Sequence, residues 1–508
     1  MKKLFAAIDV GSYELSMKIF EFGKKSGVKE IDCVRHRIDI GNDTFHTGLI
    51  SPRKMDELCD ILSGFSKVME SYKVTDYLAY GTSAIRETVN TSILLDQIEE
   101  RTGIKVSVLS NSEQRFLEYK GAALRSDFDD HIKQGAAFLD IGGGSSQITL
   151  FSEGHLVTTV NLHLGTLRIR SKIRDIEPVY SDQELLIGEI VSNELDYFKE
   201  LYLNDLKVYN IIIIDDYLSA IMTQVSSRPD GHILSRSYKE IMKALSVKTT
   251  YQIAERLFIP EENASLLIPS AIIVDKVISI TGATDLYMPG VSLADGIAYD
   301  YADKKNYIRS GHDFTDDILS SANNIAERYG AFDSITNKMV SSALAIFDAT
   351  KTLHGMTDRE RLLLEISAIL RNSGKYVSMS MPAEVTYSII LNSEIIGISH
   401  QERKIIGTVA KYSYPNNISY EAFDIYNFSE KEQIIAAKLT AILRVATGIA
   451  KNVDKTIDTI KAAVKERELI IKVTADDKML LEKGLFSERC DTFEEIFGIT
   501  PVLRVIKK

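Results

Sequence analysis

Two glycine-containing turns carry the residue types best suited to bind an anion. An apolar run leads into Asp9-Val10-Gly11-Ser12, and a second apolar run leads into Asp140 and the residues Ile-Gly-Gly-Gly-Ser that follow it. Such turns expose successive backbone N–H groups, which bind anions without positive side chains, and glycine lets an oxyanion approach closely. The predicted phosphate-binding residues are Gly11, Ser12 and Tyr13 in the first turn and Gly142, Gly143, Gly144 and Ser145 in the second.

Each turn also begins with an aspartate, Asp9 in the first and Asp140 in the second. A carboxylate at the end of a strand can hold a divalent metal, usually through water. A single turn of either kind is more often only a flexible connection. Two in matched context favour a clamp around a phosphoryl group, so we expect magnesium, or another divalent cation, at Asp9 and Asp140.

The elements that must position these turns are two similar hairpins. Residues 5–22 and 136–151 each place an apolar strand before the turn and an alternating or apolar segment after it. The likeness of the two segments is a weak internal repeat, and it predicts two similar α/β halves. A helix is expected at 53–71, and strand, turn and helix are expected at 76–87 and again at 105–124.

The rest of the chain changes character after the second half. Residues 211–214 form a continuous apolar run typical of a strand covered on both faces, and residues 290–301 indicate a last loop and helix of that half. From about residue 314 the apolar periodicity is helical, whereas 469–506 return to strands and short helices.

Composition places the chain among soluble globular proteins of several domains. Its 508 residues are 45% hydrophobic and 26% charged, with a formal net charge of -11. That charge disfavours non-specific nucleic-acid binding, so no DNA partner is expected. Three widely spaced cysteines favour neither a zinc site nor disulfides, and a reducing cytoplasm is the predicted location. We identify no apolar stretch of membrane-spanning length and expect no membrane association.

Five segments together resemble the exopolyphosphatase / guanosine pentaphosphate phosphohydrolase (Ppx/GppA) family. Residues 5–19 and 139–147 are similar to its two phosphate loops. The other three matching segments are 80–86, which ends at Arg86, 109–114 and 164–168. The similarity covers about residues 5 to 507, and it is weaker in the helical part.

The resemblance implies a fold class and a domain order. It implies α/β architecture, with duplicated ribonuclease-H-like (actin-like ATPase/sugar kinase) domains at 1–125 and 126–305. An all-α, degenerate HD-type phosphohydrolase-like domain would follow at 306–450, and a small α+β domain at 451–508.

The resemblance also implies an activity. It is removal of terminal phosphate from polyphosphate, or of the 5′-phosphate of guanosine pentaphosphate, with magnesium. Arg86 would balance charge that develops on the phosphate oxygens, and relatives suggest a homodimer.

Two departures from the family pattern concern the catalytic carboxylates. The glutamates expected at the ends of segments 109–114 and 139–147 are Gln114 and Gln147 here. An amide can orient water but cannot accept its proton, and losing a general base typically costs ~10²–10⁴ in rate. Glu113 could replace the lost base through a register change, or simply serve the helix N-terminus. Glu14 could do so from the first turn, although a solvent-facing turn residue is the more ordinary interpretation.

Further departures affect Tyr13, the third loop and the helical domain. Tyr13 replaces a family asparagine, and could narrow the cleft or stack on a base. Asp215-Asp216 replace small residues of a third loop, and could bind a metal or cap a helix. Arg371 and Asn372 occupy the place expected for a metal-binding His-Asp pair, and arginine cannot ligate a metal. His312-Asp313 indicates a helix start rather than a metal site.

Three hypotheses follow from these residues. The first is a magnesium-dependent phosphohydrolase, supported by the two intact loops and Arg86. The second is a binding module that holds polyphosphate or a nucleotide as a sensor, supported by Gln114 and Gln147. A sugar kinase or ATPase is the third, and the missing glycine-rich loop near residue 215 argues against it.

Overall fold

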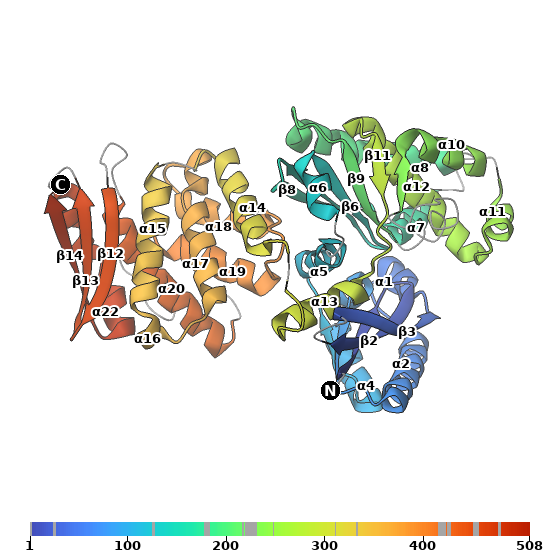
Figure 1. Cartoon of the computed structure of the whole chain (residues 1–508), viewed down its shortest axis with the longest axis horizontal. Coiled ribbons are helices and arrows are strands. Elements are labelled where there is room, and N and C mark those ends of the chain that lie inside the picture. Colours follow the sequence, from blue (N-terminus) through green and yellow to red (C-terminus); the bar gives the residue numbers. More distant parts are fainter. Residues whose placement is uncertain are drawn as a thin grey trace. The chain divides into compact units, whose positions relative to one another are not determined.

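The chain divides into two compact units, Met1–Asp317 and Ile318–Lys508. The structure, a computed structural model, describes residues 3–507 except 24–26, 124–126, 177–182, 216–217, 219–230, 247, 310, 332–333, 415–422, 424–427, 451–456 and 476–478. Figure 1 labels the elements of both units.

The first unit contains two sheets with the same strand order. In the first sheet the order is β3-β2-β1-β4-β5, and in the second it is β8-β7-β6-β9-β11, extended by an antiparallel edge strand, β10. The strands of the first sheet are β1 (Lys3–Val10), β2 (Glu14–Gly23), β3 (Gly27–Arg37), β4 (Asp76–Gly81) and β5 (Val106–Val108). Those of the second are β6 (Ala136–Ile141), β7 (Ser146–Ser152), β8 (His155–Leu162), β9 (Asn210–Ile214), β10 (His232–Leu234) and β11 (Asp285–Tyr287).

This repeated order confirms the two predicted hairpins and the α/β, actin-like architecture. β1 pairs antiparallel with β2 and parallel with β4, just as β6 pairs with β7 and β9. Every residue of β9 is buried, as its continuous apolar run predicted. Because β1 and β6 occupy equivalent central positions, the turns that follow them occupy equivalent places at the ends of their sheets.

Helices cover the sheets of the first unit. They are α1 (Ile40–Thr47), α2 (Pro52–Tyr72), α3 (Ser83–Glu87), α4 (Thr91–Thr102), α5 (Asn111–Ala123), α6 (Phe128–Lys133), α7 (Thr166–Ile176), α8 (Gln183–Phe198), α10 (Ser235–Ser246), α11 (Thr250–Leu257), α12 (Glu261–Thr281) and α13 (Leu293–Lys304). The predicted elements at 53–71, 76–87 and 105–124 are confirmed by α2, by β4 with α3, and by β5 with α5.

Helix α13 returns to the first sheet, although the sequence indicated it as the last helix of the second half. Its apolar residues share a core with Phe5, Phe20 and Phe22 of β1 and β2. It also crosses α5 closely, since a methyl group on Gly296 would lie 2.0 Å from the carbonyl oxygen of Leu117. Helix α13 therefore packs both on the strands formed by the start of the chain and on α5.

The prediction that no segment is apolar enough to span a membrane was wrong for α12. Its residues Asn263–Thr281 form a helix of sufficient length and mean hydropathy, 1.7, and half of this segment is buried inside the protein. Leu267, Ile273 and Val277 pack in the core of the second sheet. Core helices of globular proteins pass the same test of length and composition, and the packing of α12 is of that kind.

The second unit is helical at first and ends in a small sheet. Its helices are the C-terminal part of α14 (Phe314–Arg328), α15 (Ser334–Ala349), α16 (Lys351–His354), α17 (Asp358–Leu370), α18 (Pro382–Asn392), α19 (His400–Tyr412), α20 (Glu430–Ile449), α21 (Leu480–Phe486) and α22 (Asp491–Phe497). The sheet has the order β12 (Ile457–Lys465), β13 (Glu468–Ala475), β14 (Thr500–Lys507).

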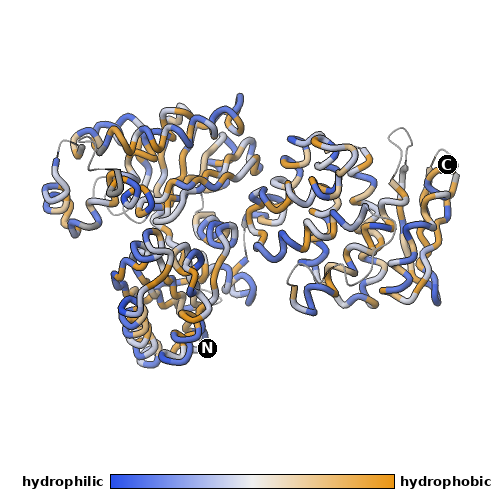
Figure 2. Tube along the Cα trace, turned by 180° about the vertical axis from the view of Figure 1, so that it is seen from behind, coloured by the Kyte–Doolittle hydropathy of each residue, from blue (hydrophilic) through white to orange (hydrophobic). Residues whose placement is uncertain are grey.

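Local signals explain where several of these helices begin. Ser399 with Glu402, and Ser429 with Glu432, form reciprocal capping boxes at the starts of α19 and α20. In Figure 2, hydrophobic and hydrophilic residues alternate along the helices, as expected for helices that bury one face.

Candidate active site

The predicted residues gather around one narrow cavity of the first unit, with a volume of about 100 Å³. It is bordered by the β1–β2 and β6–β7 turns, the β4–α3 connection, α5, and the start of α13. The predicted residues that line it are Asp9, Gly11, Ser12, Tyr13, Glu14, Arg86, Gln114, Asp140, Gly142, Gly143, Gly144 and Ser145. A larger cavity of about 730 Å³ among α8, α10, α11 and α12 contains none of them, so the smaller cavity is the candidate site.

The first loop is a tight turn fixed to its neighbour. The Gly11 N–H donates to the Glu14 carbonyl at 3.1 Å, and a methyl group on Gly11 would lie 2.5 Å from that oxygen, so the turn requires glycine. The Ser12 hydroxyl lies 2.7 Å from that of Ser83 and accepts the N–H of Ala84 at 3.1 Å. The start of α3, which carries Arg86, is thereby joined to the first loop.

The second loop is held from behind by α7. The Gly142 N–H donates to the Ser145 carbonyl at 3.0 Å, and the N–H groups of Leu167 and Arg168 donate to Gly143 at 3.0 and 3.1 Å. A methyl group on Gly165 would lie 2.2 Å from the carbonyl carbon of Gly144. Because these contacts occupy the loop carbonyls, the loop is positioned before any ligand arrives.

Tyr13 and Glu14, which follow the first loop, have different surroundings. The Tyr13 ring is 7% exposed and packs with Leu167 and Leu266, so it narrows the cavity wall and is not available to stack on a base. Glu14 pairs with Arg35 at 3.3 Å in a partly exposed position. It lines the cavity, but as a solvent-facing residue at the start of β2.

Arg86 is directed toward the start of α5. Its guanidinium donates to the Leu109 carbonyl at 2.7 Å and to the side chain of Asn111. These bonds fix the group at the cavity wall, where a positive charge favours an anionic ligand.

Glu113 is turned back on its own helix. Its Oε2 accepts the N–H of Ser110 at 3.0 Å and the Ser110 hydroxyl at 2.7 Å, and the Glu113 N–H donates to that hydroxyl at 3.2 Å. It does not line the cavity. Of the two interpretations of Glu113, the structure supports the one that assigns it to the helix N-terminus, because the carboxylate caps the first turn of α5.

Two residues that the sequence analysis missed complete the wall formed by α5. Arg115 and Glu118 both line the cavity, and their side chains are 3% and 8% exposed. Arg115 Nη1 donates to Glu118 at 3.2 Å and to Asp140, while its Nη2 donates to the Ser145 carbonyl at 3.0 Å. Gln114 Nε2 donates to the other oxygen of Glu118 at 3.2 Å.

Helical spacing was the signal for Glu118. Residues four apart lie on the same face of a helix, so Glu118 follows Gln114 one turn later on the wall that faces the cavity. Burial, together with the charge of Asp140, raises the pKa of Glu118 well above its ordinary value. The wall formed by α5 thus carries a carboxylate at Glu118, one turn after the amide of Gln114.

Gln147 lies behind the second loop rather than on the cavity wall. It is directly opposite Asp140 in the β6–β7 pair and is 1% exposed. Its Nε2 lies 3.5 Å from the Thr149 hydroxyl, and its Oε1 has no hydrogen-bond partner among the described residues. Gln147 is close to the site but does not touch the space that a ligand would fill.

Asp215 of the third loop is buried, and both of its carboxylate oxygens accept hydrogen bonds. It accepts the N–H of Leu218 at 2.6 Å and the hydroxyl of Ser270 at 2.8 Å, and it lines the cavity. Asp216 lies outside the described residues.

The donor set around the cavity does not fit a metal held between Asp9 and Asp140. The Arg115 guanidinium already pairs with Asp140, and a cation on the same carboxylate would be repelled. Among the residues that the structure describes, no three His, Cys, Asp or Glu side chains gather as a metal site. Asp9 lines the cavity from the other loop.

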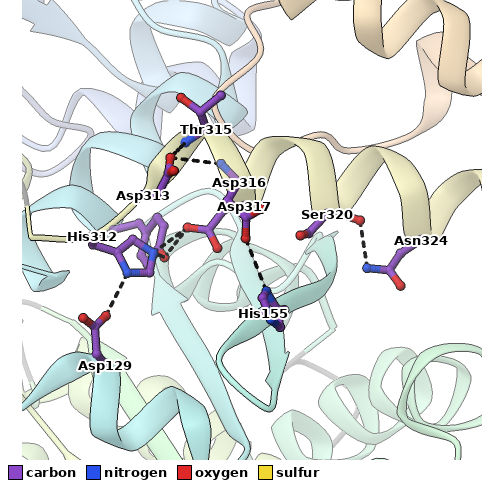
Figure 3. Close-up of polar contacts among 10 residues, drawn as sticks. Asp129, His155, His312, Asp313, Thr315, Asp316, Asp317, Ser320 and Asn324 are labelled. Atoms are coloured by element: carbon purple, nitrogen blue, oxygen red, sulfur yellow. Dashed lines mark hydrogen bonds and ion pairs between the residues drawn. The ribbon is translucent and has the colours of Figure 1, made fainter. Parts of the chain in front are cut away.

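His312 and Asp313 belong to a polar cluster at the start of α14 (Figure 3). Asp313 accepts the N–H groups of Thr315 and Asp316 at 3.0 and 3.2 Å, which confirms the predicted helix start. His312 contacts Asp129 at 2.8 Å and Asp317 at 2.7 Å through its two ring nitrogens. The dipeptide is thus part of the link from α14 to α6.

In the second unit, Arg371 has a packing role. Its guanidinium donates to the Ser413 hydroxyl at 2.7 Å and stacks 3.8 Å from the centre of the Tyr414 ring. Burial lowers its pKa to about 10. A buried cation occupies the place where a metal ligand was expected.

Sequence comparison finds two family models along the chain. The Ppx/GppA phosphatase family matches residues 24–305, and domain III of Ppx/GppA phosphatases matches residues 319–492.

Curated relatives carry several names. A bifunctional 3-dehydroquinate synthase/phosphatase of Fusobacterium nucleatum is 26% identical over 48% of this chain and 38% of its own. A guanosine-5′-triphosphate,3′-diphosphate pyrophosphatase of Vibrio atlanticus is 20% identical over 80% of both chains. An exopolyphosphatase 1 of Mycobacterium leprae is 23% identical over 37% of this chain and 55% of its own. The chain therefore spans well under two thirds of the first and third of these relatives.

Solved structures agree on the fold. An exopolyphosphatase from Cytophaga hutchinsonii superposes with a TM-score of 0.53 at 18% identity, covering 59% of this chain and 98% of its own. A Ppx/GppA family member from Aquifex aeolicus gives 0.50 at 17% identity, covering 60% and 99%.

Proposed function

Because the chain belongs to the Ppx/GppA phosphatase family, we propose that it is a phosphohydrolase acting between its two glycine loops. The substrate is inorganic polyphosphate, which loses terminal phosphate, or guanosine pentaphosphate, which loses its 5′-phosphate. Relatives named for both activities support this substrate class.

The observation that carries the proposal is the meeting of both loops at one cavity with Arg86 and Arg115. The loops offer backbone N–H groups for phosphate oxygens, and two guanidinium groups lie in the same wall. An anionic ligand thereby meets backbone N–H groups and two guanidinium groups at one site, in a chain of net charge -11.

Glu118 is the proposed general base. It is a cavity-lining carboxylate one turn after Gln114, and the Gln114 amide fixes one of its oxygens at 3.2 Å. A carboxylate with a raised pKa accepts a proton more readily than an ordinary one. Gln114, beside it, can orient the attacking water, and Arg86 stabilises charge on the phosphate oxygens.

Magnesium enters this proposal with the substrate rather than as a resident ion. In phosphoryl-transfer sites Mg²⁺ is commonly held by one or two carboxylates together with substrate phosphates. We propose Asp9 of the first loop as the carboxylate that contacts this ion, because it lines the cavity.

The alternative is a family member that binds polyphosphate or a nucleotide as a sensor without turnover. Gln114 and Gln147 favour it, because neither amide can accept a proton. The cavity-lining position of Glu118 is the specific observation that favours hydrolysis instead.

The remaining proposals concern the whole protein. We propose that 1–125 and 126–305 are two domains, that 306–450 form an HD-type domain without its metal ligands, and that 451–508 form a small α+β domain. Buried Arg371 supports the loss of ligands, and limited proteolysis tests the boundaries. A cytoplasmic homodimer is proposed from family resemblance, and it is tested by sedimentation and by cell fractionation.

Phosphate release from long-chain polyphosphate with magnesium tests the function. We expect release by the wild type and a rate about 10²–10⁴ lower for Glu118→Gln. Glu365→Gln is the matched control, since Glu365 is a half-buried carboxylate of α17 whose pKa burial also raises, far from the cleft in sequence and in the other unit.

Other outcomes separate the alternatives. If the wild type releases no phosphate but the Gln114→Glu/Gln147→Glu variant does, the sensor hypothesis is supported. If the wild type releases phosphate and Glu118→Gln releases it equally fast, the general base is another carboxylate. Glu14 is then the next candidate. If the wild type and every folded variant release no phosphate, the proposed substrate class is contradicted.

A further inference from the structure

Arg115 places a guanidinium directly beneath the second phosphate loop. It pairs with Asp140 at the end of β6, donates to the Ser145 carbonyl at 3.0 Å, and contacts Glu118 at 3.2 Å. A methyl group on Gly142 would lie 3.0 Å from its Nη2. The cation therefore lies against the loop backbone, between the loop and α5.

The contacts of Arg115 are those of a cation that organises a site. Its planar guanidinium donates hydrogen bonds to the carboxylate of Asp140, the carbonyl of Ser145 and the carboxylate of Glu118 at the same time. This geometry suits arginine rather than lysine. Its side chain is 3% exposed, and its Nε has no hydrogen-bond partner among the described residues. The group is thus buried at the cavity wall with hydrogen-bonding capacity to spare.

The guanidinium of Arg115 lies between two carboxylates and stays charged there. The family pattern has carboxylates at the positions of Gln114, Asp140 and Gln147, whereas this chain keeps only Asp140 of the three, and its Arg115 contacts both Asp140 and Glu118. Although burial lowers the pKa of Arg115, the charges of Asp140 and Glu118 raise it above its ordinary value, so the guanidinium stays charged.

We propose that Arg115 is the built-in cation of the second phosphate loop, and that this loop binds the oxyanions of a polyphosphate chain without a divalent metal. The proposal rests on the proposed function, because it names what holds the same substrate class. It leaves magnesium free to act with the substrate at the first loop, in turnover rather than in binding.

Tripolyphosphate binding, measured calorimetrically in EDTA and in magnesium, tests this inference on the full chain. Wild-type affinity is expected to differ between the two conditions by less than about threefold. Arg115→Gln is expected to lose ~tenfold or more in EDTA, the range for a charged hydrogen bond, and to recover in magnesium, because Asp140 becomes free to hold the ion.

Two further variants guard against trivial explanations. Arg403→Gln removes an equally buried guanidinium that pairs with Glu394 in the second unit, and it should leave tripolyphosphate affinity unchanged. Arg115→Lys keeps a charge at the site, and it should retain metal-free binding better than Arg115→Gln does.

The outcomes that overturn the inference are distinct from failure of the proposed function. A wild type that binds in magnesium but loses more than about tenfold in EDTA shows that the second loop needs a metal. Arg115→Gln binding like wild type in EDTA removes Arg115 from the site. Absence of binding by the wild type in both conditions contradicts the proposed function itself, and the inference falls with it. If Arg115→Gln does not fold, the inference is still tested by the wild-type affinity in EDTA and in magnesium, and by the affinity of Arg115→Lys in EDTA.

Discussion

At the scale of single residues, the chemistry of the cleft is redistributed along α5. Gln114 has lost the proton-accepting group of the family pattern, while Glu118 and Arg115 bring a carboxylate and a guanidinium to the same wall. The loop residues could be predicted from sequence because glycine and aspartate at a strand end have few other uses together. The helical spacing of Glu118 from Gln114 was a signal for that residue, whereas the role of Arg115 could not be predicted, because it depends on which face of α5 meets Asp140.

Tyr13 and Glu113 show the same limit. Both stand beside the motif in sequence, yet the Tyr13 ring packs against Leu167, and Glu113 caps its own helix. Whether a residue next to a motif points into a cavity depends on packing partners that are distant in sequence.

The second loop provides a residue-scale prediction at Gly165. Alanine there would bring a methyl group within 2.2 Å of the Gly144 carbonyl carbon, which belongs to rigid backbone. We expect Gly165→Ala to lower the free energy of unfolding by about 1–3 kcal/mol and to weaken tripolyphosphate binding by displacing the loop. Calorimetric titration and thermal unfolding measure the two effects.

Gly64→Ala is the control for this substitution. Gly64 lies in the exposed middle of α2 with nothing within 4 Å of an added methyl group, so alanine should stabilise the helix by up to about 1 kcal/mol and leave binding unchanged. Unaltered binding in a folded Gly165→Ala protein would contradict the view that α7 positions the loop.

At the scale of elements, α5 is the part that connects the cleft to the rest of the first unit. Its N-terminal half lines the cavity, its middle crosses α13 at Leu117 and Gly296, and Tyr119 donates to Asp317 at 2.6 Å. The strands and most helices were predictable from periodicity. The return of α13 to the first sheet was not, because apolar periodicity shows that a helix buries a face without showing against what.

The start of α14 provides an element-scale prediction of pH dependence (Figure 3). His312 faces Asp317 on α14, Asp129 on α6 and Tyr119 on α5. Burial lowers the pKa of His312, but the hydrogen bonds and charges of Asp317 and Asp129 outweigh burial and raise it above the ordinary value. The folded state therefore binds the proton more tightly than the unfolded state does.

The sign of the effect follows from that difference. Stability from His312 is fully present below its unfolded pKa of about 6.5, and it is lost as pH rises through the higher folded-state pKa. We expect His312→Gln to lower the thermal unfolding midpoint more at pH 5.5 than at pH 8.5. His155→Gln, which removes an exposed pair with Asp316, should change little at either pH. An equal effect of His312→Gln at both pH values would contradict the assignment.

At the scale of the whole molecule, the repeated strand order explains why one chain has two phosphate loops. Central strands β1 and β6 have the same neighbours, so their turns are equivalent by topology and face one cavity. The internal likeness of residues 7–12 and 138–145 predicted this duplication, because the repeat preserves both the end of the strand and its turn. All described residues that line the cavity belong to the first unit.

This confinement leads to a prediction for a fragment of the chain. Two solved relatives span about the same length as the first unit, covering 59–60% of this chain and 98–99% of their own, so a chain of this extent can fold alone. The cut should follow α14, because Asp317 and His312 hold Tyr119 of α5. We therefore expect fragment 1–330 to fold cooperatively and to bind tripolyphosphate within about threefold of the full chain.

A shorter fragment serves as its control. Fragment 1–305 ends after α13 and lacks both His312 and Asp317, which leaves the buried Tyr119 hydroxyl without these two partners. An unsatisfied buried hydroxyl costs about 1–3 kcal/mol, so this fragment should unfold at a lower temperature than fragment 1–330. If fragment 1–330 is folded by circular dichroism but binds more than tenfold weaker than the full chain, the second unit contributes to the binding site. The cleft described by the first unit alone is then incomplete.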